Sequence, residues 1–231
     1  MQKIKNKIKN DNLHKKLLFN SIEVKFVDQP KSPVNSQKVL SKIEKDLPYH
    51  LFSGYVNKII FGNFDFFEER DFNAYYDKNA KIIYIRSKDQ DNNIDLYDDL
   101  IHEFSHAVQS KYKNYIFSDG KVKAEFVKKR LKLFYSLIID YGKTINSKKF
   151  LITSFDKELD DLFYKTIGYT KMQKYIKGVF PSAYAPTSLD EYWAEGFEMY
   201  FLNKKEELLN ICPRLFAKID TLYQEKINED N

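Results

Sequence analysis

The sequence predicts a single α+β domain, with a small mixed sheet in the N-terminal half and helices in the rest. Two observations predict this class. Short segments before residue 90 alternate apolar and polar residues, as half-buried strands do, whereas apolar residues recur at helical spacing from residue 93 onward. The 231 residues include only seven Gly and six Pro, so we expect regular structure with few long loops.

The N-terminal half is expected to contain four strands and one helix. The strand segments are residues 21–27, 56–61, 72–76 and 81–86. The last two flank a short polar turn and therefore predict a hairpin. Ser36 is expected to cap a helix that runs to about Asp46 and ends before Pro48.

Five further helices are predicted, the first of them capped by Asn93. They cover about residues 93–111, 122–140, 157–166, 189–202 and 213–225. Residues 1–20 are rich in lysine and are expected to be a frayed basic segment before the domain, which spans residues 21–231. Within that domain, residues 21–112 hold the sheet and the helix from residue 93, and residues 113–231 are helical.

Composition narrows the class of protein. The net charge of +5 comes from interspersed charges of both signs, which argues against nucleic-acid binding. No apolar run reaches the length of a membrane span, and the start lacks the apolar core of a signal peptide. Cys212 is the only cysteine, so no internal disulfide can form, and we expect its thiol to be buried. We expect a monomer that is cytoplasmic or exported by a non-classical route.

The strongest chemical signal is an H-E-x-x-H motif within the helix predicted at residues 93–111, formed by His102, Glu103 and His106. At about 100° per residue, the apolar residues of this helix gather on one arc, and these three residues fall on the opposite arc. Residues four apart lie one above the other, so both imidazoles can reach one tetrahedral ion. The motif therefore predicts one Zn²⁺ per chain, with Glu103 as the general base of a metallopeptidase.

A catalytic zinc site usually takes a third protein ligand and leaves one position open. Glu191 and Glu195 lie four apart on the helix predicted at residues 189–202, so they share a face. One could bind the metal while the other hydrogen-bonds a ligand imidazole. Ser188 and Glu191 also form a capping-box pattern, in which Glu191 would only reach back to the start of its helix. Because the chain also carries an H-E-x-x-H motif, we favour the metal-ligand role for Glu191 over the capping role.

These motifs resemble the lethal factor-like zinc metallopeptidases, a zincin group that includes the catalytic domain of anthrax lethal factor and the Pro-Pro endopeptidases. The likeness rests on HEFSHAV at residues 102–108, on EYWAEGF at residues 191–197, and on Tyr184, seven residues before Glu191. It implies a zincin-like fold and an endopeptidase that acts on a peptide or protein substrate. It also implies that residues 81–86 form the sheet edge along which a substrate pairs.

Carried over by position, the resemblance implies that His102, His106 and Glu191 bind the zinc ion and that Glu103 is the general base. It implies further that the Tyr184 hydroxyl stabilises the oxyanion and that Glu195 hydrogen-bonds a zinc ligand without binding the ion itself. Glu191 follows the second histidine by 85 residues, a longer interval than in those relatives. The excess, mainly residues 121–180, is expected to be an added helical insertion.

Two other hypotheses about the function remain open from the sequence alone. A zincin-like chain that no longer cuts could serve as a binding or structural module, although the intact Glu103 argues against such decay. An H-E-x-x-H protease of another family, such as a regulatory protease, would need a nearer acid to complete the site, and Asp119 or Glu125 could supply it. Neither acid has the paired glutamates and preceding tyrosine of the segment around Glu191.

Overall fold

The computed structural model describes residues 16–225, apart from 32, 71, 89 and 143–144. The chain is α+β, as predicted, and divides into two compact units, Met1–Lys111 and Tyr112–Asn231. The division falls inside α4 (Asn93–Phe117), where the backbone of Tyr112 leaves the helical region with φ −111° and ψ 23°. That the two units form one domain stays a prediction.

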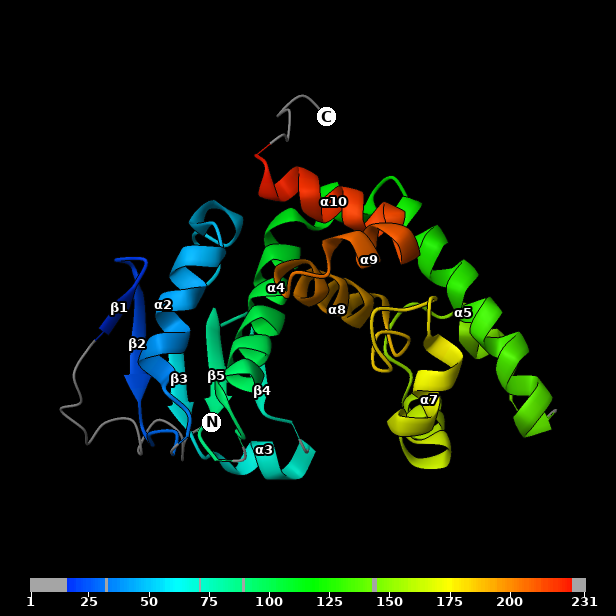
Figure 1. The fold of residues 1–231 in the computed structure, drawn as a ribbon, viewed down its shortest axis with the longest axis horizontal. Coiled ribbons are helices and arrows are strands. Elements are labelled where there is room, and N and C mark those ends of the chain that lie inside the picture. The colour runs from blue at the N-terminus through cyan, green and yellow to red at the C-terminus, as the bar shows by residue number, and fades with distance from the viewer. Residues whose placement is uncertain (1–15, 32, 71, 89, 143–144, 226–231) are drawn as a thin grey trace. The chain divides into compact units, whose positions relative to one another are not determined.

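The first unit is built on a five-stranded mixed sheet with the order β1-β2-β3-β5-β4 (Figure 1). The strands are β1 (Lys16–Leu18), β2 (Ile22–Phe26), β3 (Lys58–Gly62), β4 (Ala74–Asp77) and β5 (Ile82–Arg86). The three central strands β2, β3 and β5 are parallel, and β1 and β4 each pair antiparallel with a neighbour. The small mixed sheet, its last four strands and the β4–β5 hairpin are as predicted.

Two expectations about the sheet are wrong. The end of the segment predicted to fray forms β1, because Phe19 and Asn20 adopt positive φ and turn the chain back onto β2. The rest of that segment, residues 1–15, lies outside the described residues. The expected edge strand, β5, lies inside the sheet, because its hairpin places β4 beyond it. Among the described strands, β4 is the edge on that side.

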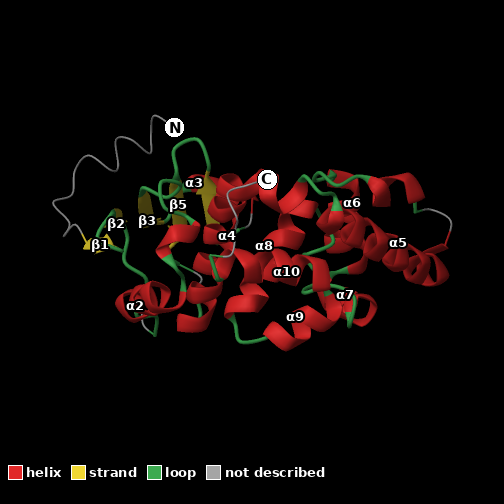
Figure 2. Cartoon of the chain, turned by 90° about the horizontal axis from the view of Figure 1, so that it is seen from above, coloured by secondary structure: helices red, strands yellow, loops and turns green. Residues whose placement is uncertain are grey.

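The two faces of the sheet are covered differently. On one face the alternate residues Val24, Ile59 and Ile83 are fully buried, and Figures 1 and 2 show α2 (Ser36–Asp46) and the first part of α4 lying over the strands. The other face carries an aromatic cluster in which Ile60 packs with Phe64 and Phe67 around α3 (Asp65–Arg70). Both faces of the central strand β3 are therefore buried, as is typical of parallel sheets.

The apolar arc predicted on α4 faces the core of the first unit. Leu100, Ile101 and Phe104 have no exposed surface, and the Phe104 ring lies 4.6 Å from that of Phe52. The Tyr97 hydroxyl donates a hydrogen bond of 2.9 Å to Asp46 at the end of α2. This packing fixes the rotation of α4, and with it the direction in which the opposite arc points.

Two helix caps differ from the predictions by one residue. Asn35, rather than Ser36, caps α2, and its Oδ1 accepts from the Lys38 N–H at 2.9 Å. Asn92, rather than Asn93, caps α4, and its Oδ1 accepts from the Ile94 N–H at 2.7 Å. Asparagine and serine are comparable N-cap residues, so cap preference alone does not determine which of two neighbouring candidates caps the helix.

All the regular elements described in the second unit are helices or helical turns. Its helices are α5 (Lys121–Tyr141), α6 (Lys157–Asp161), α7 (Tyr169–Ile176), α8 (Leu189–Phe201), α9 (Lys205–Ile211) and α10 (Pro213–Tyr223). A 3₁₀ turn, η3 (Ser147–Leu151), and a π-helical turn, η4 (Leu162–Ile167), lie between α5 and α7. The predictions of α5, α8 and α10 are confirmed, the segment at 157–166 divides into α6 and η4, and α7 and α9 were missed.

Glu125 of α5 ties three helices of this unit together. Its carboxylate accepts a hydrogen bond of 2.8 Å from the Tyr192 hydroxyl of α8. It also accepts from the backbone N–H groups of Arg214 and Leu215 at 2.9 and 3.2 Å. A carboxylate at these N–H groups caps α10 and complements its dipole. These polar contacts help to set the orientation of α8 among the helices of its unit.

Gly196 of α8 lies where a larger residue would meet α10. A Cβ built there would lie 2.2 Å from Cδ2 of Leu215, a side chain with no exposed surface. We expect Gly196→Ala to lower the free energy of unfolding by about 1–3 kcal/mol, measured by urea denaturation. Adding Leu215→Ala removes the clash, so the double variant should lose less stability than the sum of the two single variants. Additive losses would contradict this account.

Candidate metal centre

The H-E-x-x-H motif occupies the middle of α4, on the arc opposite the core. Within residues 100–109, all of which are described, only His102 and His106 are half-buried, and the others are buried. Their rings lie 5.1 Å apart, centroid to centroid, with 78° between the ring planes. Two half-buried imidazoles one helical turn apart present their nitrogens side by side, as a shared metal ligand pair requires.

Glu103 differs from the two histidines in its burial. Its exposed fraction is 6%, although a carboxylate is rarely buried without a partner or a function. Two serine hydroxyls donate to backbone carbonyls within the same helix: Ser105 donates to the His102 carbonyl at 2.5 Å and Ser110 to the His106 carbonyl at 2.8 Å. We refer to His102, Glu103 and His106 as the motif set.

The second unit presents a row of carboxylates on α8. From Glu191 to Phe201, all of them described residues, only Glu191, Glu195 and Glu198 are half-buried, and every other residue is buried. Positions four and seven apart share one helix face, so the three carboxylates form a single stripe. The first two members were predicted from the sequence as site residues, whereas Glu198 was not. The same helical spacing, extended by one turn, would have found it.

The carboxylate stripe, as we call these three glutamates, begins at the cap of α8. The Ser188 hydroxyl accepts a hydrogen bond of 3.1 Å from the Glu191 N–H, so Ser188 is the N-cap, as its position suggested. This bond uses only the backbone of Glu191. The capping role of Ser188 and a ligand role for the Glu191 carboxylate are therefore compatible.

Tyr184 lies in the turn that leads into α8. The Ser182 hydroxyl accepts from the Tyr184 N–H at 3.1 Å, and the Tyr184 carbonyl accepts from the Thr187 N–H at 3.0 Å, which holds the turn in place. Burial raises the pKa of Tyr184, and the negative charge of Glu191 raises it further. The phenol therefore stays protonated at neutral pH and remains a hydrogen-bond donor close to the carboxylate stripe.

The two alternative acids are engaged in structural contacts. Glu125 caps α10 and accepts from Tyr192, as described above. Asp119 accepts from the Lys121 N–H at 3.0 Å and forms an ion pair of 3.0 Å with Lys218. Both carboxylates thus hold the helices of the second unit together, which weakens the case for either as a metal ligand.

Two further residues of the second unit are buried. Trp193, which lies between the first two glutamates of the stripe, has no exposed surface and packs within the second unit, its ring 5.9 Å from that of Phe197. Cys212 is fully buried too, and burial raises the pKa of its thiol to about 11. A thiol with such a pKa is almost entirely protonated at neutral pH, so it is a poor nucleophile.

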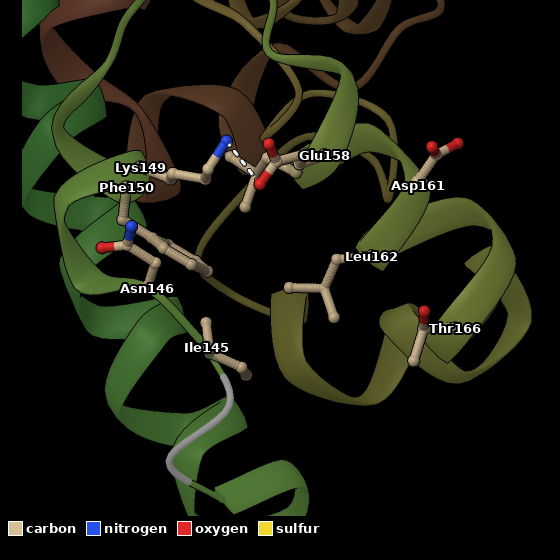
Figure 3. Close-up of a pocket in the computed structure, with 9 residues that line it drawn as sticks. Ile145, Asn146, Lys149, Phe150, Glu158, Asp161, Leu162 and Thr166 are labelled. Carbon is tan, nitrogen blue, oxygen red and sulfur yellow. Dashed lines mark ion pairs between the residues drawn. The ribbon is translucent and has the colours of Figure 1, made fainter.

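A cavity of about 330 Å³ lies elsewhere in the second unit, between η3 and the turn formed by α6 and η4. Figure 3 shows Ile145, Phe150 and Leu162 along it, with the ion pair of Lys149 and Glu158 at one end. None of the predicted site residues lines it. The cavity belongs wholly to residues 145–166, inside the segment that the resemblance implies to be an insertion.

The structure thus groups the predicted site residues in two sets. His102, Glu103 and His106 share one arc of α4 in the first unit, and Tyr184, Glu191 and Glu195 gather at the start of α8 in the second. In comparisons with known proteins, no family model, curated protein or solved structure matches the chain. No helix in the described residues combines the length and the apolar character needed to cross a membrane.

Proposed function

We propose that the chain is a zinc-dependent endopeptidase with a zincin-like fold of the lethal factor-like group. His102, His106 and Glu191 would bind a single Zn²⁺, with Glu103 as the general base and Tyr184 as the oxyanion donor. The observation that carries the proposal is the selective exposure on α4. In a helix segment that is otherwise buried, the two side chains left half-buried are both imidazoles, at the spacing of a metal ligand pair.

The donor set fits zinc by its chemistry. Two imidazoles and one carboxylate are a common protein ligand set of catalytic zinc, and they leave one position open. His102, His106 and Glu191 are each half-buried, so each side chain could offer a donor atom to an ion. Sulfur is absent from the set, which distinguishes it from the closed structural sites made mainly of cysteine.

When bound, zinc would lower the pKa of a coordinated water and polarise the scissile carbonyl. The residues of the chain would do the rest. Glu103 would take the proton from the attacking water and pass it to the leaving amine. The Tyr184 hydroxyl, kept protonated by burial, would donate to the oxygen on which negative charge develops. Glu195 would hydrogen-bond one of the ligands from the next turn of α8.

Zinc content tests the proposal most directly. We expect the purified chain to carry close to one zinc ion per molecule by atomic emission spectroscopy, and His106→Ala to lose it, because two ligands hold the ion poorly. His50→Ala is the matched control and should leave zinc content unchanged, since His50 lies outside the motif set in the 3₁₀ turn η1 (Tyr49–Leu51). The Lys111 ammonium of α4 donates to the backbone carbonyl of His50, which alanine retains. A wild-type chain without zinc after growth in zinc-supplemented medium would refute the proposal.

A peptide library separates the enzyme from a binding module. The zinc-loaded wild-type chain is expected to cleave some peptides within the library, and mass spectrometry of the products would define the substrate preference. A chain that binds one zinc ion but cuts no peptide would instead support a non-catalytic module with a retained metal site.

A further inference from the structure

One contact of the second histidine comes from its own helix. Gln109 lies three residues after His106 on α4, and its side-chain oxygen Oε1 is 3.5 Å from Nδ1 of the imidazole. The Gln109 side chain is buried, with an exposed fraction of 9%. Its position is therefore restrained by packing, and its amide oxygen faces one particular nitrogen of the ring.

The identity of that nitrogen matters for metal binding. A neutral imidazole carries its proton on one nitrogen and offers the lone pair of the other, so only one nitrogen can be a ligand in each tautomer. An amide oxygen is an acceptor and cannot face a lone pair favourably. Beside an acceptor such as Gln109 Oε1, the favoured tautomer of His106 is the one that carries its proton on Nδ1 and its lone pair on Nε2.

We infer that Gln109 is a positioning residue that selects the Nδ1–H tautomer of His106 and so presents Nε2 to a divalent cation. The role of Gln109 rests on the proposed function, because the cation concerned is the proposed zinc ion. Partners of this kind fix the ring orientation and raise the basicity of the ligand. Their loss typically weakens metal binding about 10- to 100-fold.

Two substitutions separate this role from a merely structural one. Gln109→Leu keeps an apolar body of similar size and removes the acceptor. We expect it to raise the zinc dissociation constant about 10- to 100-fold, measured by competition with a chromophoric chelator. Gln109→Glu keeps an acceptor at the same reach, so it should bind zinc within a few-fold of wild type. If Gln109 acted only through packing, Gln109→Glu should bind zinc more weakly than Gln109→Leu, because a buried carboxylate destabilises the fold more than leucine does.

The tautomer itself gives a readout that needs no metal. In the zinc-free wild-type chain, ¹⁵N NMR of the histidine side chains is expected to show His106 protonated on Nδ1, and Gln109→Leu to shift it towards the Nε2–H form. Ser110→Ala is the matched control, because the Ser110 hydroxyl donates to the backbone carbonyl of His106 and not to its imidazole. Unchanged zinc affinity and tautomer in Gln109→Leu would overturn this inference alone, whereas absence of zinc from wild type would overturn the proposed function.

Discussion

Glu103→Gln is expected to abolish peptide cleavage while leaving zinc in place. Gln has nearly the same shape, so it fits the buried position of Glu103, where the exposed fraction is 6%, but it cannot accept the proton from the attacking water. Loss of a general base typically costs about 10²- to 10⁴-fold in rate. The measurement is kcat on a peptide found in the library, with zinc content determined on the same preparation.

Asp95→Asn on the same helix is the control for this change. Asp95 lies in the first turn of α4, where its charge complements the helix dipole and its carboxylate accepts from the Asn92 side chain at 3.0 Å. Its loss should leave both zinc and kcat unchanged. If Glu103→Gln lost zinc together with activity, Glu103 would be a ligand or a structural residue, and its assignment as the base would be wrong.

Tyr184→Phe is expected to have the second-largest effect. Removing a donor to the oxyanion typically costs about 2.7–4 kcal/mol of transition-state stabilisation, which corresponds to about a 10²- to 10³-fold loss in kcat. Because the bond forms mainly in the transition state, KM should change little. Steady-state kinetics on the same peptide separate the two parameters, and zinc content should match wild type.

A neighbouring tyrosine provides a matched control for Tyr184→Phe. The ring of Tyr169 lies 6.0 Å from that of Tyr184, and its hydroxyl donates to Asp160 at 3.4 Å. Tyr169→Phe removes the same group from the same region without removing the proposed oxyanion donor, so kcat should stay near the wild-type value. Equal losses in both variants would indicate that the tyrosines act through packing.

The elements that could be predicted from the sequence are those whose local pattern and tertiary surroundings agree. The alternation of β2 matches its burial, residue by residue, because one face lies under helices and the other is only partly covered. The apolar arc of α4 was predictable for the same reason, since Leu100 and Phe104 have a buried environment that matches their spacing. In both elements, periodicity alone determines which side chains enter the core.

The elements that were missed are short and depend on partners distant in the sequence. β1 has three residues and exists only because the turn at Phe19 and Asn20 brings it against β2. α9 has seven residues, fewer than an isolated helix needs for stability, and packs through Leu208 into the second unit. The position of β5 inside the sheet depended on where β4 would pair, which no pattern within residues 81–86 encodes.

The residues of the candidate site also differ in how far the local sequence predicts them. His102, Glu103 and His106 form a recognisable string because all three ligand and base roles fall within one helical turn and a half. Glu198 and Gln109 carry no such signature, since a third glutamate or a glutamine on a helix is common. Helical spacing places Glu198 on the face of Glu191 and Glu195, but the burial of its neighbours is what marks the three as one stripe. The contact between Gln109 and the imidazole is visible only in the structure.

The hydrogen bonds of Glu125 bear on how the second unit behaves without a metal. Tyr192 is adjacent to Glu191, and Glu125 anchors it through contacts that involve no ligand. α8 therefore owes its placement among its neighbouring helices to the polypeptide itself. In small zinc-finger domains the ion organises the chain and its removal unfolds the protein. Here a chelator would leave the glutamates of α8 prearranged, so that apo and loaded forms would share one helical scaffold.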